Sequence, residues 1–323
     1  MNRIKKRVVT KDEVNLRIDK WFRLYYPSLP HGRLEKLLRD GNIRVDGSRC
    51  KANYRLLEGQ EIRVPPISNN DHETYKKKNK VTDKNFLSLI LNSIIYKDDK
   101  LIIINKPYGV SVQGGTGQVN YIDGALDYLK FGFDSRPKLV HRIDKDTSGI
   151  LILGRTDKST IKLTELFRNN RIEKIYWAVV IGKPANNSGI INASLKKNVD
   201  NNYERMEVNT ALGKKSITNF SIVSNLSKKV TWLDLRPTTG RTHQLRAHCS
   251  HLGVPIIGDK KYGGISSSFT NLTHSKKLHL LARGIKINFD EGKSRIFYAP
   301  LPEHMKNTFR YFGFDEFEGK GFE

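Results

Sequence analysis

A short polar segment beside an apolar run holds the residues best suited to chemistry. In KLVHRIDKDTSGILILG, residues 138–154, His141, Arg142 and Asp144 lie within four positions, and three more polar residues, 146–148, precede the apolar run. The run predicts a buried strand, which would hold Asp144 at the edge of a core, where neighbouring groups set its pKa. A carboxylate held there could act as a nucleophile or as an acid–base catalyst.

A hydrolase site could be built from Ser148, His141 and Asp144. No G-x-S-x-G segment surrounds Ser148, however, so the sharp turn that exposes a nucleophilic serine is not predicted. Thr147 and Ser148 are better interpreted as side chains that hydrogen-bond the backbone of their own turn. A phosphate loop is not predicted either, because GGTG at 114–117 fits neither G-x-G-x-x-G nor a segment followed by GK[ST].

Metal-binding residue types gather in RTHQLRAHCSH, namely His243, His248, Cys249 and His251. Their spacing matches no standard zinc site, and the neighbouring arginines would repel a cation. We therefore predict no metal here and interpret these histidines as backbone-capping or RNA-contacting groups.

Potential partners of Asp144 lie far along the chain. RPTTGRTHQLRAH supplies Arg236, Arg241 and Arg246, whose charge would help to keep a carboxylate ionised. EKIYWAVVIG reads as a strand with Tyr176 on the face opposite its apolar neighbours. Taken singly, each arginine could be an ordinary surface residue and Tyr176 a core residue. Together with Asp144 they indicate a site.

Charge is the strongest bulk signal, since the 323 residues include 57 Lys and Arg against 33 Asp and Glu, a net +24. This excess favours nucleic acid as the partner, with a generally basic proteome or association with a membrane surface as the alternatives. The two cysteines, Cys50 and Cys249, form no C-x-x-C pair and predict neither a disulfide framework nor cysteine-bound zinc. Because no apolar run of about 20 residues and no secretory signal occur, a cytoplasmic protein without a membrane span is expected.

The first segment, residues 1–66, predicts two short helices and a small hairpin. Apolar residues at helical spacing mark the helices in LRIDKWFRLYY and GRLEKLLRDG. The second helix carries Arg33, Lys36 and Arg39 on its polar face. VDG then predicts a hairpin turn and GQEIRV a closing strand. Residues 67–84 lack apolar periodicity and predict a flexible linker.

Residues 85–323 predict one larger domain of mixed α and β structure. Strands are expected at 101–105, 150–154, 175–181, 230–236 and 285–289. One helix is predicted to start near Thr156 or Asp157, and another lies within 241–251. Since regular helices do not separate the strands, a doubly wound parallel sheet is not favoured.

Residues 15–64 resemble an S4 RNA-binding module of the αL type. The resemblance rests on LRIDKWF, GRLEKLLRDGNIRVDGSRC and GQEIRV, which cover nearly all of that segment. It implies that the helix face with Arg33, Lys36 and Arg39 grips structured RNA through its phosphates and its shape.

The larger domain resembles the RluA-type pseudouridine synthases over about residues 90–302. NKPYGVSVQGG, HRIDKDTSGILIL, KIYWAVV and TTGRTHQLRAHCSHLGVPIIGDKKYGG stand in the order and spacing of that family, followed by LHLLAR and FYAPLP. The resemblance implies an α+β fold with a mixed, largely antiparallel sheet and flanking helices. It also implies an isomerase that converts uridine to pseudouridine in RNA, with no metal or organic cofactor.

The same resemblance implies roles for single side chains. Asp144 is the essential nucleophilic or proton-transferring carboxylate, and Arg246 pairs with it. Tyr176 stacks on the target base and is a candidate for proton transfer. Arg142 enters the RNA stack in place of the extruded uridine. Further RNA-binding candidates in this domain are His141, Arg241 and His243.

Three functions are to be distinguished. The S4-like module and VQGGTG favour an enzyme that acts on 23S-type rRNA or on precursors of the large ribosomal subunit. The same chemistry on tRNA is the second. The third is a non-catalytic RNA-binding or ribosome-assembly protein, which would not need Asp144, Tyr176 and Arg246 together. We expect a monomer without a protein partner.

Overall fold

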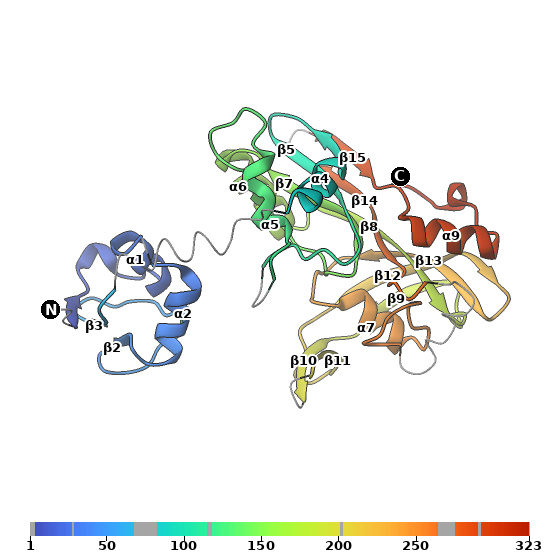
Figure 1. Cartoon of the computed structure of the whole chain (residues 1–323). Helices are drawn as coiled ribbons and strands as arrows, with labels where there is room; N and C mark the ends of the chain where they lie inside the picture. The colour runs from blue at the N-terminus through green and yellow to red at the C-terminus, as the bar shows by residue number, and fades with distance from the viewer. Residues whose placement is uncertain are drawn as a thin grey trace. The chain divides into compact units, whose positions relative to one another are not determined.

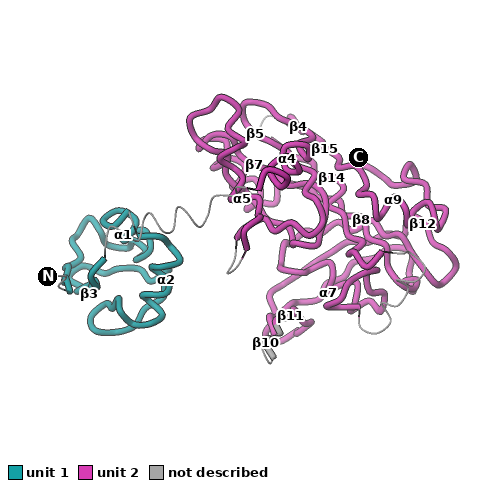
Figure 2. Tube along the Cα trace, in the orientation of Figure 1, with its two compact units in different colours: residues 1–80 teal, residues 81–323 magenta. Residues whose placement is uncertain are grey.

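The computed structural model describes residues 4–27, 29–67, 83–114, 118–200, 203–263, 275–289 and 292–322. The chain forms two compact units, residues 1–80 and 81–323, which are described separately (Figures 1 and 2). The predicted linker at 67–84 lies outside the described residues, except for 67, 83 and 84.

Unit 1 combines two helices with a small antiparallel sheet of order β1-β3-β2. Its elements are β1 (Lys5–Val8), α1 (Ile18–Tyr25), α2 (His31–Arg39), β2 (Arg44–Val45) and β3 (Glu61–Val64), with a 3-10 turn at Lys11–Glu13. Both helices and the last two strands agree with the sequence prediction. β1 was not predicted, because KKRV is exposed throughout and has no buried face to give an apolar pattern.

The predicted stripes of the two helices meet in the core of unit 1. Trp21 and Phe22 of α1 pack with Leu34 and Leu38 of α2 in one buried cluster. The opposite face of α2 is left in solvent and carries the basic side chains. At the predicted hairpin turn, the Asp46–Gly47 pair has φ angles of 48° and 74°, as a tight two-residue turn requires.

Unit 2 is built on one large sheet. Within the described residues the sheet has ten strands in the order β4-β5-β7-β14-β8-β13-β12-β9, with β6 beside β7 and β15 beside β14. The strands are β4 (Ile94–Lys97), β5 (Leu101–Lys106), β6 (Lys138–Leu139), β7 (Ser148–Gly154), β8 (Ile172–Ile181), β9 (Ser188–Asn192), β12 (Ile217–Leu226), β13 (Val230–Pro237), β14 (Leu280–Asn288) and β15 (Ser294–Tyr298). In addition, β10 (Leu195–Asp200) pairs antiparallel with β11 (Tyr203–Val208).

Helices flank this sheet (Figure 1). They are α4 (Lys84–Asn92), α5 (Ile122–Ala125), α6 (Asp157–Arg168), α7 (Gln244–His251) and α9 (Glu303–Phe312), with 3-10 turns at Leu126–Leu129 and Glu316–Glu318. No described helix is long and apolar enough to cross a membrane.

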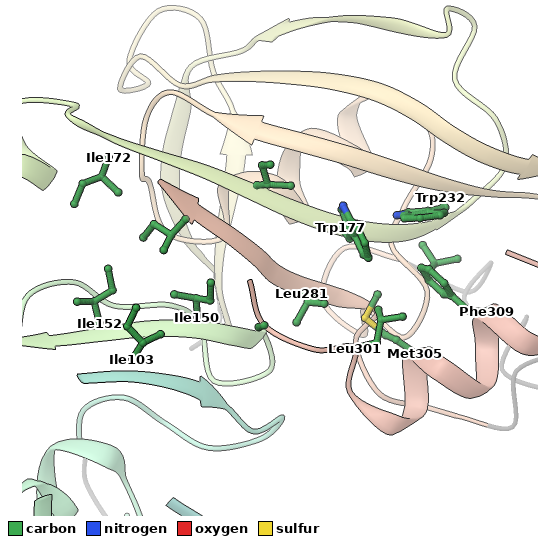
Figure 3. Close-up of a cluster of buried hydrophobic side chains, with 14 of the residues drawn as sticks. Ile103, Ile150, Ile152, Ile172, Trp177, Trp232, Leu281, Leu301, Met305 and Phe309 are labelled. Carbon is green, nitrogen blue, oxygen red and sulfur yellow. The ribbon is translucent and has the colours of Figure 1, made fainter. Parts of the chain in front are cut away.

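Two buried clusters cover β5 and β7 on opposite faces. Ile103 and Ile152 join the larger cluster, which includes side chains of α6 and α9 and the Trp177–Trp232 pair, whose ring centroids are 4.7 Å apart (Figure 3). Ile102 belongs to the other cluster, with side chains of α4 and α5. Burial on both faces explains why these strands appear in the sequence as unbroken apolar runs.

The strand β14 holds the two halves of the sheet together. It pairs parallel with β7 and antiparallel with β8, and the other strand pairs observed in the sheet are antiparallel. Ala282 lies opposite both Gly149 of β7 and Tyr176 of β8. The predicted mixed, largely antiparallel sheet is therefore confirmed, and its register brings the turn before β7 close to the middle of β8.

Candidate active site

Asp144 lies in the turn that leads into β7. The Thr147 N–H donates to the carbonyl oxygen of Asp144 at 3.2 Å, which closes the turn. Gly149, with φ at 107°, permits close packing on β14, because a Cβ there would overlap the carbonyl oxygen of Ala282. Ile143 is buried and anchors the turn in the core. The backbone of Asp144 is thus held at the edge of the sheet by residues on both sides of it.

A buried lysine, Lys106, holds the backbone of this turn by hydrogen bonds. The Nζ of Lys106, which is fully buried, donates to the carbonyl oxygens of Lys145 at 2.8 Å and of Pro107 and Val110 at 2.9 Å. Burial lowers the pKa of Lys106 to about 7, although the charges of Asp146 and Asp144 oppose the shift. Three acceptors match the three N–H groups of an ammonium, so this geometry favours the charged form. The role of Lys106 was not predicted from the sequence, because its partners are backbone atoms.

Tyr176 points from β8 toward the same region. It lines one pocket together with Asp144 and Arg246, three residues from distant segments of the chain. Burial raises the pKa of the Tyr176 hydroxyl, and the Asp144 carboxylate raises it further. Its phenol is therefore protonated at neutral pH, which suits an aromatic surface or a hydrogen-bond donor and not a base.

The pocket brings together six of the residues singled out by sequence analysis. It has a volume of about 90 Å³, and these six residues are Arg142, Asp144, Tyr176, Arg241, His243 and Arg246. Arg142 is exposed, and its guanidinium forms no hydrogen bond or ion pair with the described residues. Arg241 donates to the carbonyl oxygen of Lys215 at 3.3 Å.

Arg246 forms its ion pair with Asp259, not with Asp144 as predicted, although the Asp144 charge also helps to raise the pKa of the guanidinium against the effect of burial. Arg246 binds Asp259 in bidentate fashion, with Nε and one terminal nitrogen each 2.7 Å from a carboxylate oxygen. Both side chains are buried, and Asp259 also accepts the N–H groups of Lys261 and Tyr262. This bidentate geometry gives the guanidinium its counter-charge, so Arg246 reaches the pocket as an already paired cation.

Arg236, a second predicted cation for Asp144, also has other partners. Its Nε donates to Asp234 at 3.0 Å and its terminal nitrogen to the carbonyl oxygen of Gly321 at 2.9 Å. It lines a neighbouring pocket instead of the one that contains Asp144.

The ionisable side chain nearest to the Asp144 carboxylate in the described contacts is His243. Its Nε2 lies 4.0 Å from the Asp144 Oδ2, and its Nδ1 lies 3.0 Å from the Tyr262 hydroxyl. The Tyr262 oxygen accepts the N–H of Met206 at 2.9 Å, so its own proton can be donated to Nδ1. That arrangement leaves the imidazole proton on Nε2, facing Asp144. Burial lowers the pKa of His243, although the Asp144 charge acts in the opposite direction. The lowered pKa favours the neutral ring.

Gln244 fixes the segment that carries Arg241 and His243. Its side-chain oxygen accepts from the Thr239 hydroxyl and from the Arg241 N–H, and its nitrogen donates to Ile217 and Thr218. His243 itself has φ at 50°, the left-handed region, directly before α7 begins. Gln244, Tyr262 and Asp259 were not predicted, since single polar residues of this kind form no periodic pattern.

His141, a predicted RNA contact, has partners within the protein, and its contact with RNA stays a prediction. The N–H of Ile152 donates to its Nε2 at 2.9 Å, and the ring stacks on Phe167 with centroids 4.4 Å apart. Burial, together with the charge of Lys174, lowers the pKa of His141 to about 3. The imidazole is therefore neutral, and it bridges β7 and α6.

The other histidines near α7 have protein partners too. His248 is buried, with Nδ1 3.0 Å from the Thr218 hydroxyl and Nε2 3.0 Å from the carbonyl oxygen of Ala193. Within the described part of the chain, no group of three or more His, Cys, Asp and Glu side chains is arranged to hold a metal ion.

Comparisons with known proteins agree with this fold. Residues 100–251 match the family model described as RNA pseudouridylate synthase. Two relatives are named ribosomal large subunit pseudouridine synthase C. The Rickettsia typhi protein is 35% identical, over 90% of this chain and 95% of its own length. The Vibrio vulnificus protein is 36% identical, over 95% of this chain and 98% of its own.

Solved structures share the fold. Human RNA pseudouridylate synthase domain containing 4 aligns with a TM-score of 0.60 and 24% identity, over 74% of this chain and 98% of its own. Human RNA pseudouridylate synthase domain containing 1 aligns with a TM-score of 0.53 and 25% identity, over 65% of this chain and 83% of its own. The chain belongs to the RluA-type RNA pseudouridine synthases, isomerases that act on uridine in RNA.

Proposed function

We propose that this enzyme isomerises uridines of the large-subunit rRNA, with Asp144 as its catalytic carboxylate. The observation that carries the proposal is the meeting of Asp144, Tyr176 and Arg246 in one pocket. The names of the relatives from Rickettsia and Vibrio support large-subunit rRNA as the substrate. The surplus of positive charge suits a polyanionic substrate of this kind.

The chemistry requires a carboxylate and a surface for a base, and both are present. The N1–C1′ bond of uridine breaks, the uracil turns, and a C5–C1′ bond forms, so no atom is gained or lost. Asp144 can serve as the nucleophile or take part in proton transfer. The protonated ring of Tyr176 can hold the uracil while it turns. The His243 Nε2 faces the Asp144 carboxylate at 4.0 Å from Oδ2.

Arg142 is proposed to replace the extruded uridine in the RNA stack. A base inside a helix cannot reach the pocket, so the nucleotide must flip out. Arg142 is exposed at the pocket rim and also lines a neighbouring pocket with Gln113 and Lys145. Its planar guanidinium has no protein partner among the described residues, and such a group can stack where a base has left.

Unit 1 is proposed to be the S4-like module that selects rRNA, with Arg33, Lys36 and Arg39 at its phosphate-binding face. All three side chains are exposed on α2. Changing them together to Gln should weaken binding to intact rRNA and flatten its salt dependence by about 0.7–0.9 in log–log slope for each lost contact. Turnover of a short fragment containing the target should change little. Equal losses on both substrates would contradict the assignment.

The proposal as a whole is tested by mapping pseudouridine in total RNA from cells with and without this gene. We expect specific pseudouridines of the large-subunit rRNA to disappear with the gene and to return with the wild-type protein. If pseudouridines disappeared only from tRNA, the substrate would be tRNA and not rRNA. No change in any RNA would favour a non-catalytic RNA-binding protein.

A further inference from the structure

Lys174 is a pocket cation whose charge no described protein group neutralises. It lines the pocket of Asp144 and Tyr176, and it also lines a second pocket, of about 270 Å³, with Asn219 and Phe322. The side chain is partly buried, and its Nζ forms no hydrogen bond or ion pair with any described residue.

Three other cations of unit 2 have protein acceptors for their charged groups. Lys106 donates to three carbonyl oxygens, and Arg246 pairs with Asp259. Arg155 donates to the carbonyl oxygens of Asp98, Lys130 and Phe131. Lys174 has no such acceptor, and burial lowers its pKa, because partial loss of water without a partner disfavours the charged form. A bound anion would supply the missing partner.

We propose that Lys174 binds a backbone phosphate of the RNA next to the target uridine. The proposal rests on the proposed function, since it assumes that the flipped uridine occupies the pocket of Asp144. Lys174 and Tyr176 are alternate residues of β8, so they point to one face of the sheet about 7 Å apart. This spacing is comparable with the distance from a base to its own backbone. An RNA strand whose uracil lies on Tyr176 would therefore pass its phosphate over Lys174 toward the second pocket.

The chemistry of the surroundings favours a phosphate over a base as the ligand. A neutral uracil needs no full cation, whereas each phosphodiester carries a negative charge that a lysine ammonium binds as a point charge. In the second pocket the guanidinium of Arg236 is already bound to Asp234 and Gly321. The adjacent Glu173 is engaged by Asn288. The charge available where the two pockets meet is that of Lys174.

The first test is Lys174→Met in the full-length enzyme, assayed on a short RNA that contains the mapped uridine. We expect kcat/KM to fall by about 10- to 100-fold, mainly through KM, because one charge-assisted contact is lost. The log–log salt dependence of RNA binding should flatten by about 0.7. Lys174→Arg should retain most of the activity. The Tm should not fall, because no bond within the protein is removed.

The matched control is Lys183→Met. Lys183 is an exposed lysine just beyond the other end of β8 and lines neither pocket. The Lys183→Met substitution removes the same charge as Lys174→Met. It should leave kcat/KM and the salt dependence of RNA binding near the wild-type values. Identical kinetics and identical salt slopes for the two variants would overturn the proposal.

A second test changes the RNA instead of the protein, so it does not depend on how a variant folds. Each phosphodiester flanking the target is replaced in turn by a neutral methylphosphonate. At one position the wild type should lose about as much kcat/KM as Lys174→Met loses on normal RNA, and Lys174→Met should lose nothing further there. Equal losses for both proteins at every position would reject the contact. Absence of pseudouridine with wild-type enzyme on unmodified RNA would instead reject the proposed function.

Discussion

Asp144→Asn should abolish pseudouridine formation while the protein still folds and binds RNA. The amide has the shape of the carboxylate but cannot attack a sugar carbon or accept a proton, so we expect the single-turnover rate to fall by at least about 1,000-fold. Stability should hardly change, because the described contact of the Asp144 side chain is His243, with 4.0 Å between Oδ2 and Nε2. Pseudouridine quantification and an RNA-binding titration measure the two effects separately.

Asp146→Asn is the control for this substitution. It makes the same chemical change two residues away, at a side chain that does not line the pocket. It should leave the rate within a few-fold of wild type. If Asp144→Asn turned over at the rate of this control, Asp144 would not be the catalytic carboxylate.

Arg246→Ala should reduce both stability and activity. It leaves Asp259 as a buried carboxylate without its cation, which destabilises a protein by about 3–5 kcal/mol. For a unit of this size we expect the Tm to fall on the order of 10 °C. Activity should fall by at least about 100-fold, because a cation of the pocket is lost and the segment carrying Tyr262 and His243 loses its anchor.

The double variant Arg246→Ala/Asp259→Asn separates the two effects. Removing the unpaired negative charge of Asp259 should restore a large part of the lost Tm. Activity should stay low, because the Arg246 guanidinium is still absent. Recovery of activity together with the Tm would show that Arg246 acts only through the fold. Thermal unfolding and single-turnover assays on the same samples distinguish these results.

Sequence alone predicted the strands that are buried on both faces, because their apolar runs depend only on local composition. It also predicted which distant residues share the pocket, since their segments matched a known order and spacing. Which charged side chains pair with each other could not be predicted from the sequence. Arg246 could be expected to bind a carboxylate, but Asp144 and Asp259 are equal candidates until the turn after α7 places Asp259 against the guanidinium.

Residues that act through backbone atoms or through a single hydrogen bond were also missed. Lys106 satisfies carbonyl oxygens, and Tyr262 holds one ring nitrogen of His243. Neither role imposes a period or a motif on the sequence. His141 shows the converse, since its place in a reactive-looking segment suggested RNA contact while its ring packs between β7 and α6.

The central place of β14 has a consequence for how the enzyme is made. β14 lies between β7 and β8, so the Asp144 turn and Tyr176 come into register across a strand that is translated after both of them. Pairings between segments so distant in sequence form slowly, whereas unit 1 can fold as soon as it leaves the ribosome. A nascent chain would therefore gain its RNA-binding module early and its catalytic site only near the end of synthesis.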